Sequence, residues 1–324
     1  MKRVAVVTSG GDAPGMNAAV RAIVRTGTDN GMTMFGVRNG YDGLIAGDFI
    51  PLSNRDVSEI LHLGGTFLGT ARCPDFKKKP EVRDHAVEKL HDHQMDGLVV
   101  IGGNGSQSGS ARISELGFPV VGVASTVDND LIGSDITIGV DTALNIIIES
   151  IDRIRTTAES HHRAFLVEVM GRDSGYLALA AGIAGGADVI VTPENDLEPA
   201  EVERQLRAAH ERGKRYALAV TTDGAVHNAK QCMDYFKSHE DEIGYELRVT
   251  ILGHVQRGGA PSTFDRILAS RLGTAAARLM AGGGNGQLVG WIDGAIAYTP
   301  LEEVAGRHKT APAEMWELHR VLTR

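Results

Sequence analysis

Cysteine is almost absent from this chain, since Cys73 and Cys232 are the only two among 324 residues. Two thiols cannot form the disulfide framework of a secreted domain, and their spacing fits no metal-thiolate site. Long hydrophobic runs are missing too, because glycine or charge interrupts each one before the roughly 20 residues of a membrane span. No signal-peptide pattern follows Met1. We therefore expect a cytoplasmic protein that does not bind membranes.

An excess of positive charge is also lacking. The chain has 33 Lys and Arg against 41 Asp and Glu, a formal net charge of -8. This balance argues against non-specific nucleic-acid binding, although a local arginine cluster can still bind a small anion. With 324 residues, 42% of them hydrophobic, the chain is long enough for about two domains with sizeable cores.

Two segments of the first half share the order strand, glycine turn, helix. The apolar runs 4–7 and 97–101 are followed by Gly10–Gly15 and Gly102–Ser106, and helical patterns follow over about 18–25 and 107–116. Backbone N–H groups at such a turn and the positive end of the helix favour a phosphate. The first turn matches neither the P-loop nor the dinucleotide fingerprint. The alternative is that the glycines only permit close packing.

Two carboxylates follow a third apolar run, residues 120–124, within Ser125–Asp130. Ligands of open α/β sheets bind at the carboxyl ends of the strands, where this segment would lie. If the chain is extended there, Asp128 and Asp130 share a side, so one can act as a base while the other holds a cation. The alternative is an Asp-Asn-Asp turn that caps the next element.

The second half is again predicted to be α/β. A helix is expected over 141–158, strands over 164–169, 189–191, 217–220 and 248–252, and a helix over 263–280. Several basic residues are predicted to be carried by loops at or near strand ends, an arrangement that suits capture of a phosphate ester: Arg163, Arg172, Arg248, His254 and Arg257.

These parts together fit phosphoryl transfer, which needs a phosphate cradle, a divalent cation, a base and positive charge on the transferred group. The glycine turns would form the cradle, Asp128 the base and Asp130 a ligand of Mg²⁺, while Arg72 and Arg172 would neutralise developing charge. The residues alone therefore predict a kinase that acts on a phosphorylated small molecule.

The order and content of five motifs resemble the family of bacterial ATP-dependent 6-phosphofructokinases. The resemblance rests on residues 10–17, 64–66, 126–130, 170–172 and 253–259. It implies two Rossmann-like three-layer α/β/α domains. The expected nucleotide domain comprises 1–139 and 256–306, and the expected fructose 6-phosphate domain 140–255 and 307–324. It also implies a glycolytic kinase that uses ATP and Mg²⁺ to phosphorylate the 1-hydroxyl of fructose 6-phosphate, as a cytoplasmic homotetramer with active sites shared between subunits.

The resemblance also implies roles for single residues. Asp128 is similar to the base, Thr126 to the contact of the transferred phosphoryl, Arg172 to the transition-state arginine and Asp130 to a metal-side carboxylate. The implied ATP-binding set is Gly11, Arg72, Cys73, Gly103, Asn104, Gly105 and Ser106. The implied sugar-phosphate set adds Met170, Gly171, Asp223, His254 and Arg257, with Arg163 and Arg248 from a neighbouring subunit. An effector site for ADP and phosphoenolpyruvate would use Arg21, Arg25, Arg55, Arg155, Asp188 and Lys214.

Several positions depart from the family pattern. Asn104 replaces an aspartate associated with Mg²⁺, and Mg²⁺ prefers charged oxygen ligands. Asp223 is shorter than the usual glutamate, Cys73 stands where an aromatic residue packs the adenine, and Asp188 replaces a glutamate. The alternative function is therefore a catalytically weakened paralogue with a regulatory role. Gly105 favours ATP as donor, because pyrophosphate-using relatives carry aspartate there.

Overall fold

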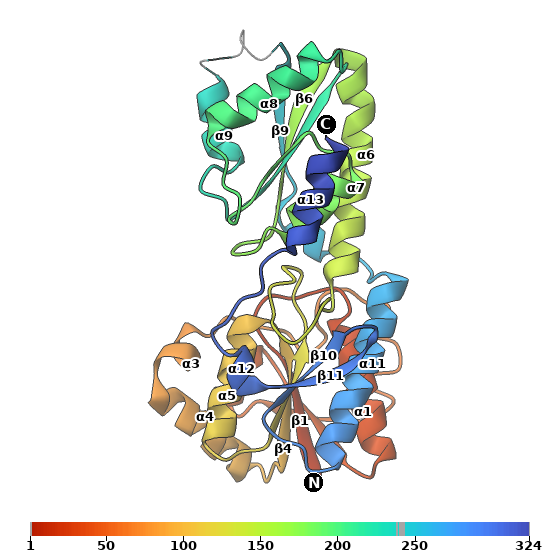
Figure 1. Cartoon of the computed structure of the whole chain (residues 1–324). Coiled ribbons are helices and arrows are strands. Elements are labelled where there is room, and N and C mark those ends of the chain that lie inside the picture. The colour runs from red at the N-terminus through yellow and green to blue at the C-terminus, as the bar shows by residue number, and fades with distance from the viewer. Residues whose placement is uncertain (1, 238, 240–243, 324) are drawn as a thin grey trace. The chain divides into compact units, whose positions relative to one another are not determined.

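The computed structural model describes residues 2–237, 239 and 244–323. The chain forms two compact units, each built from more than one stretch of sequence (Figure 1). The first unit comprises Met1–Val127, Leu131–Thr142 and Arg257–His308, and the second comprises Asp128–Asp130, Ala143–Gln256 and Lys309–Arg324. Which ligand each unit binds stays a prediction.

The first unit is built on a seven-stranded sheet with the order β11-β10-β5-β4-β1-β2-β3. The five inner strands run parallel, and the two edge strands, β3 and β11, are antiparallel to their neighbours. The strands are β1 (Arg3–Thr8), β2 (Thr33–Val37), β3 (Phe49–Leu52), β4 (Gly97–Gly102), β5 (Val120–Ala124), β10 (Gln287–Ile292) and β11 (Ala295–Pro300).

Helices cover both faces of this sheet, which is why β1, β4 and β5 are apolar almost throughout. In Figure 1, α1 and α11 lie on one side of the strands and α4, α5 and α12 on the other. Side chains of β1 and β4 such as Val7 and Val100 pack with Leu90 and Ile113 of the helices in one buried cluster. The helices are α1 (Met16–Asp29), α2 (Gly40–Ala46), α3 (Pro74–Lys78), α4 (Pro80–Asp92), α5 (Asn104–Glu115), α11 (Thr263–Ala281) and α12 (Leu301–Val304).

The second unit has a four-stranded parallel sheet with the order β7-β8-β6-β9. Its core joins Leu166 and Ala219 of the strands to Leu206 and Phe236 of α8 and α9. The strands are β6 (Arg163–Val169), β7 (Val189–Val191), β8 (Ala217–Thr222) and β9 (Glu246–Ile251). The helices are α6 (Val140–His161), α7 (Tyr176–Ala184), α8 (Pro199–Glu211), α9 (Ala229–Phe236) and α13 (Ala313–Leu322). The first residues of α6 belong to the first unit.

The structure confirms the predicted α/β class and the strands that the apolar runs indicated. The sequence did not indicate β2, β3, β10 and β11. β3 contains Pro51 and β11 is largely exposed, so neither has the continuous apolar run of a buried strand. No helix in the described part of the chain is long and apolar enough to cross a membrane.

Candidate active site

The first glycine turn joins β1 to α1 in the first unit. Gly10 and Gly15 have φ of 87° and 108°, which glycine adopts without strain. The Gly10 N–H donates to Ala71 O over 3.4 Å, and the Thr70 hydroxyl donates to Gly10 O over 2.9 Å. These bonds fasten the loop that carries Arg72 to the glycine turn, so the predicted donor-phosphate arginine and the turn belong to one assembly.

Gly11 makes room for the side chain of Arg257, whose guanidinium lies directly against it. A Cβ added at Gly11 would stand 1.9 Å from Arg257 Nη1. The same Nη1 donates to Asp12 O over 3.1 Å, and the Arg257 side chain is only 9% exposed. The structure therefore places Arg257, which was predicted to bind the sugar phosphate, in the first unit and against the glycine turn.

The second glycine turn joins β4 to α5 beside the first. A Cβ at Gly102 would stand 2.6 Å from Ser9 O, and one at Gly103 would stand 3.1 Å from Thr126 Cβ. The missing side chains thus let three strand ends approach one another: β1, β4 and β5. Gly105 is open, since no heavy atom that would crowd an added Cβ lies within 4 Å.

The start of α5 supplies the polar groups of this turn. The helix begins at Asn104, and its first backbone N–H groups form the positive end of the helix dipole. Asn104 Nδ2 lies 3.2 Å from His308 Nδ1, and Ser106 O accepts a 2.6 Å hydrogen bond from the Tyr41 hydroxyl. Backbone donors, open space at Gly105 and neighbouring Thr126 suit a phosphate chain.

Cys73 borders the Arg72 loop as the residue before α3. It is half-buried and packs against the hydrophobic core of the first unit. Burial, and then the nearby Asp42 carboxyl, raise the pKa of its thiol to about 11. Cys73 is therefore a neutral, apolar contact at neutral pH, which is compatible with packing against a base.

The segment that carries Asp128 and Asp130 is a turn, and the expectation of an extended chain is wrong. Asn129 lies in the left-handed region with φ of 50°, so the alternation of an extended strand does not apply. Asp128 and Asp130 are 8% and 7% exposed. Lys309 donates its backbone N–H to Asp130 O over 2.7 Å. The aspartates are thus held by the fold of the turn in the second unit.

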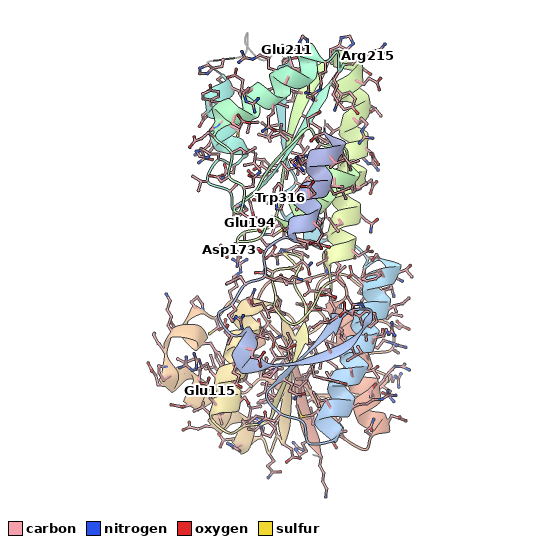
Figure 2. The ribbon with its side chains drawn as sticks, in the orientation of Figure 1. Glu115, Asp173, Glu194, Glu211, Arg215 and Trp316 are labelled. Carbon is pink, nitrogen blue, oxygen red and sulfur yellow. The ribbon has the colours of Figure 1, made fainter. Side chains whose placement is uncertain are left out.

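The loop after β6 holds Arg172 in a strained conformation with φ of 49°. Its backbone N–H donates to Asp223 Oδ1 over 2.9 Å, and its carbonyl oxygen is packed against Gly224, where a Cβ would stand only 1.6 Å away. Glu194, from the loop after β7, accepts the Gly175 N–H over 2.9 Å; Glu194 and Asp173 are labelled in Figure 2. Two carboxylates and a glycine therefore fix the backbone that presents Arg172.

Gln256 connects this loop to the turn that carries His254. The turn is a short 3-10 helix, Gly253–Arg257. The buried Gln256 side chain accepts the Met170 N–H over 3.2 Å and donates to Gly253 O over 2.9 Å. Met170, Gly171, Arg172 and His254 are thereby joined in the second unit. Sequence reasoning missed this role of Gln256, although the residue lies inside one of the quoted motifs.

Arg163 and Arg248 do not lie in loops, so this part of the sequence interpretation is wrong. Arg163 is the first residue of β6, and Arg248 lies within β9. β6 has seven residues, which at about 3.3 Å per residue separates its two ends by roughly 20 Å. Within one chain, these arginines are too far from the Arg172 loop to share one phosphate with it.

The predicted effector residues divide between the two units. Arg21 and Arg25 lie on α1 and Arg55 lies in a turn of the first unit; slight burial and the charge of Arg25 lower the pKa of Arg21. In the second unit, Arg155 donates to Gly185 O over 2.5 Å, and Lys214 pairs with the buried Asp188. Each set is built within its own unit.

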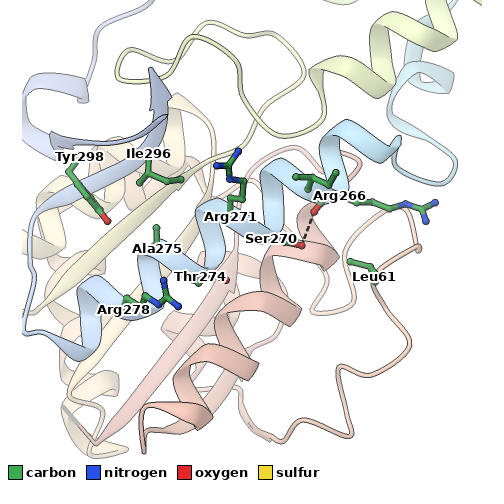
Figure 3. A pocket seen from close by; sticks show the side chains of 10 residues that line it. Leu61, Arg266, Ser270, Arg271, Thr274, Ala275, Arg278, Ile296 and Tyr298 are labelled. Atoms are coloured by element: carbon green, nitrogen blue, oxygen red, sulfur yellow. Dashed lines mark hydrogen bonds between the residues drawn. The ribbon is translucent and has the colours of Figure 1, made fainter. Parts of the chain in front are cut away.

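A separate open groove of about 570 Å³ runs along α11 in the first unit (Figure 3). Arg271 and Arg278 line it together with Ile296 and Tyr298 of β11. None of the predicted catalytic or ligand-binding residues lines this groove. It is therefore distinct from the glycine turns described above.

Comparison with known proteins identifies the family. The profile of the family described as "Phosphofructokinase" matches residues 3–280. The chain belongs to the phosphofructokinase family. It is 46% identical over 323 residues to proteins of Bacillus pumilus (strain SAFR-032) and Bacillus thuringiensis (strain Al Hakam), both named "ATP-dependent 6-phosphofructokinase", with 100% of each chain covered.

Solved structures agree with this assignment. Phosphofructokinase from Saccharomyces cerevisiae has a TM-score of 0.84 and 38% identity; the match covers 94% of this chain and 45% of the yeast chain. A pyrophosphate-dependent phosphofructokinase from Marinobacter aquaeolei has a TM-score of 0.87, covering 100% of this chain and 92% of that chain. Its identity is 21%, so this likeness supports the fold alone. The expected phosphofructokinase fold is confirmed.

Proposed function

We propose that this chain is an ATP-dependent 6-phosphofructokinase. It transfers the γ-phosphoryl group of ATP to the 1-hydroxyl of D-fructose 6-phosphate and produces fructose 1,6-bisphosphate. The observation that carries this conclusion is the 46% identity over the full length of relatives with that name. The adjacent glycine turns support it, since they supply backbone donors and open space for a phosphate chain.

We propose a role in phosphoryl transfer for each of these residues. Gly11, Gly103, Gly105 and Ser106 hold the ATP phosphates, and Arg72 neutralises their charge. Thr126 contacts the transferred phosphoryl group. Asp128 accepts the proton of the 1-hydroxyl as that oxygen attacks phosphorus, and Arg172 stabilises the negative charge that develops. The braced backbone of Arg172 supports its role, because a fixed cation needs no reorganisation during the reaction.

A divalent cation fits this assignment, and we propose Mg²⁺. Mg²⁺ usually binds one or two protein carboxylates together with water and substrate phosphates. The nearly buried Asp130 provides such a carboxylate, whereas the described residues contain no cluster of three or more side chains that would form a complete protein cage. When bound, the ion would neutralise charge on the ATP phosphates. Asn104 is at most a weak additional ligand.

The sugar 6-phosphate is assigned to basic residues of two copies of the chain. His254 and Arg257 contact it from the same chain as Arg172, with Met170, Gly171 and Asp223 at the sugar. Arg163 and Arg248 come from a neighbouring subunit. Arg163 begins β6 and Arg248 lies in the neighbouring strand β9, beside Phe165, so both are distant from the Arg172 loop at the carboxyl end of β6, which supports this division. We therefore propose a homotetramer with active sites shared between subunits.

Regulation and location follow the same family pattern. Arg21, Arg25, Arg55, Arg155, Lys214 and Asp188 are proposed to bind a nucleoside diphosphate or phosphoenolpyruvate. The net charge of -8 supports a small-molecule enzyme that does not bind nucleic acid. We place the enzyme in the cytoplasm, where ATP and hexose phosphates are its substrates and no membrane is involved.

A coupled assay tests the activity and the donor. Purified enzyme is supplied with fructose 6-phosphate and Mg²⁺, and either ATP or pyrophosphate, and formation of fructose 1,6-bisphosphate is measured. We expect turnover with ATP as the donor and none with pyrophosphate, because Gly105 leaves room for the α-phosphate of ATP. Turnover with pyrophosphate alone would contradict the donor assignment. Turnover with neither would contradict the proposed function.

No finding favours the alternative of a catalytically weakened paralogue. Asn104→Asp tests the point directly, since it restores the carboxylate that Asn104 replaces. We expect kcat to change by less than about tenfold, because Asp130 already serves the cation together with water and the ATP phosphates. A rise of several orders of magnitude from near zero would instead show that the natural chain had lost its activity.

A further inference from the structure

Glu246 lies between the two arginines at the amino end of the second unit's sheet. Its Oε2 accepts a 2.5 Å hydrogen bond from Arg163 Nε, and its Oε1 accepts a hydrogen bond from Arg248 Nη2. Glu246 is the register partner of Arg163 across the β6–β9 pair. Arg248 is two residues further along β9, so its side chain emerges on the same face as that of Glu246. The backbone register thus brings all three side chains together.

The atoms that Glu246 uses leave both arginines able to bind a second anion. The carboxylate takes the Nε edge of Arg163, so both terminal Nη groups of that guanidinium remain for another acceptor. It takes only Nη2 of Arg248. Among the described residues, neither arginine has an ion pair with any other carboxylate. The paired nitrogens therefore fix the guanidiniums without occupying all their donors.

The charge of the three side chains also suits a phosphate ester. The Arg163 guanidinium, and then Arg248, hold the pKa of the Glu246 carboxyl below its usual range, so Glu246 is ionised at neutral pH. Two guanidiniums and one carboxylate leave one positive charge. Without the carboxylate, the two cations would repel each other and each flexible side chain would have to be ordered when the ligand binds.

We propose that Glu246 is a positioning residue that holds Arg163 and Arg248 side by side as a preformed receptor for the 6-phosphate of the sugar. This inference rests on the proposed function, which assigns both arginines to that phosphate. Glu246 does not touch the substrate. It acts through the two arginines, which it holds in place before the phosphate arrives.

Glu246 also has an opposing effect, because its carboxylate competes with the phosphate for the two arginines. A carboxylate near a phosphate dianion weakens binding of the phosphate by charge repulsion. The three side chains are, however, partly exposed to water: Arg163 by 27%, Glu246 by 42% and Arg248 by 47%. Water screens such repulsion strongly. Ordering an arginine side chain costs about a factor of five in affinity, and two arginines are involved. Positioning is therefore expected to exceed repulsion.

The experiment compares Glu246→Gln and Glu246→Ala with the wild-type enzyme in steady-state kinetics. We expect both variants to raise KM for fructose 6-phosphate about tenfold, while kcat and KM for ATP change less than about twofold. Glu201→Gln is the matched control, because Glu201 is also a carboxylate of the second unit that accepts two hydrogen bonds from one arginine, Arg204. We expect its kinetics to equal those of the wild type.

Arginine variants separate failure of this inference from failure of the proposed function. If Arg163→Gln and Arg248→Gln raise KM for fructose 6-phosphate but the Glu246 variants leave it unchanged or lower it, Glu246 does not position the arginines and the inference is wrong. If the arginine variants also leave KM unchanged, the assignment of both arginines to the phosphate is wrong. Thermal denaturation of every variant excludes loss of folding as the cause of a raised KM.

Discussion

The two ends of the sheet in the second unit hold their arginines by different means. At the carboxyl end, the backbone of Arg172 is fixed by Asp223, by close packing on Gly224 and by a left-handed conformation. At the amino end, Arg163 and Arg248 sit on regular strand backbone, and one exposed carboxylate holds their side chains. The first arrangement fixes the backbone of one arginine, and the second fixes the guanidinium groups of two arginines.

This difference matches the two proposed tasks. Stabilising a transition state needs a charge that does not move during the reaction, so a rigid backbone is suited to Arg172. Binding a phosphate that arrives from another subunit needs accessible side chains, which strand residues at a sheet end provide. Substitutions at either end of the sheet, and acid titration at the amino end, test this contrast.

Arg172→Gln removes the charge at the rigid end and should reduce kcat by roughly 10²–10³-fold with little change in KM for either substrate, because the lost interaction forms mainly in the transition state. Steady-state kinetics measure it. Asp173→Asn, at the next position, is the control and should remain active. A kcat within a few-fold of wild type would remove Arg172 from the chemistry.

Gly224→Ala tests whether the rigid backbone matters beyond the charge. The new Cβ would stand 1.6 Å from Arg172 O, a backbone atom that can move only if the loop moves. We expect a loss of roughly 1–3 kcal/mol in the free energy of unfolding, together with a lowered kcat. Urea denaturation and kinetics provide the two measurements.

Gly282→Ala serves as the control for Gly224→Ala. At Gly282, which follows α11, an added Cβ would meet nothing closer than 3.5 Å, and the backbone conformation is ordinary for any residue. Its free energy of unfolding should stay within about 0.5 kcal/mol of wild type. If both alanine variants behave alike, the close packing under Arg172 has no special importance.

Asp223→Ala removes the side-chain acceptor of the Arg172 N–H and should have a smaller effect. The lost hydrogen bond is worth about 1 kcal/mol, and the left-handed residue would gain freedom. We expect kcat to fall about tenfold and the free energy of unfolding to fall by about 1 kcal/mol. An effect confined to KM for fructose 6-phosphate would instead indicate that Asp223 acts only through the sugar.

Acid titration should reveal the smallest effect, at the amino end. The folded-state pKa of Glu246 is lowered from 4.5, chiefly by its hydrogen bond from Arg163. Its contribution to stability is therefore complete above that unfolded value and is lost as the pH falls through the lower folded value. Below about pH 4.5, wild type should lose slightly more thermal stability than Glu246→Gln. Parallel melting curves would show that the ion pair adds nothing to stability.

Much of the fold could be predicted because buried parallel strands are continuous apolar runs. Residues 120–124 and 189–191 were predicted with the bounds that β5 and β7 have. Two of the four missed strands, β3 and β11, lie outside that rule, since an edge strand has no such run, whereas β2 and β10 are inner strands whose buried residues are interrupted by Gly36 and Gly290. Residue types at glycine turns likewise predicted where the backbone approaches closely, as at Gly11 and Gly103.

Local patterns and motifs along the chain are enough to predict the α/β class, the family and the residue types that phosphoryl transfer needs. The tertiary structure decided how those residues are held: Glu246 beside Arg163, Gln256 beneath Met170 and Arg257 on Gly11 are pairs separated by many positions. Only the folded backbone sets such distances. It also decided that Asp128–Asp130 forms a turn, because a left-handed Asn129 reverses the alternation that an extended chain would impose.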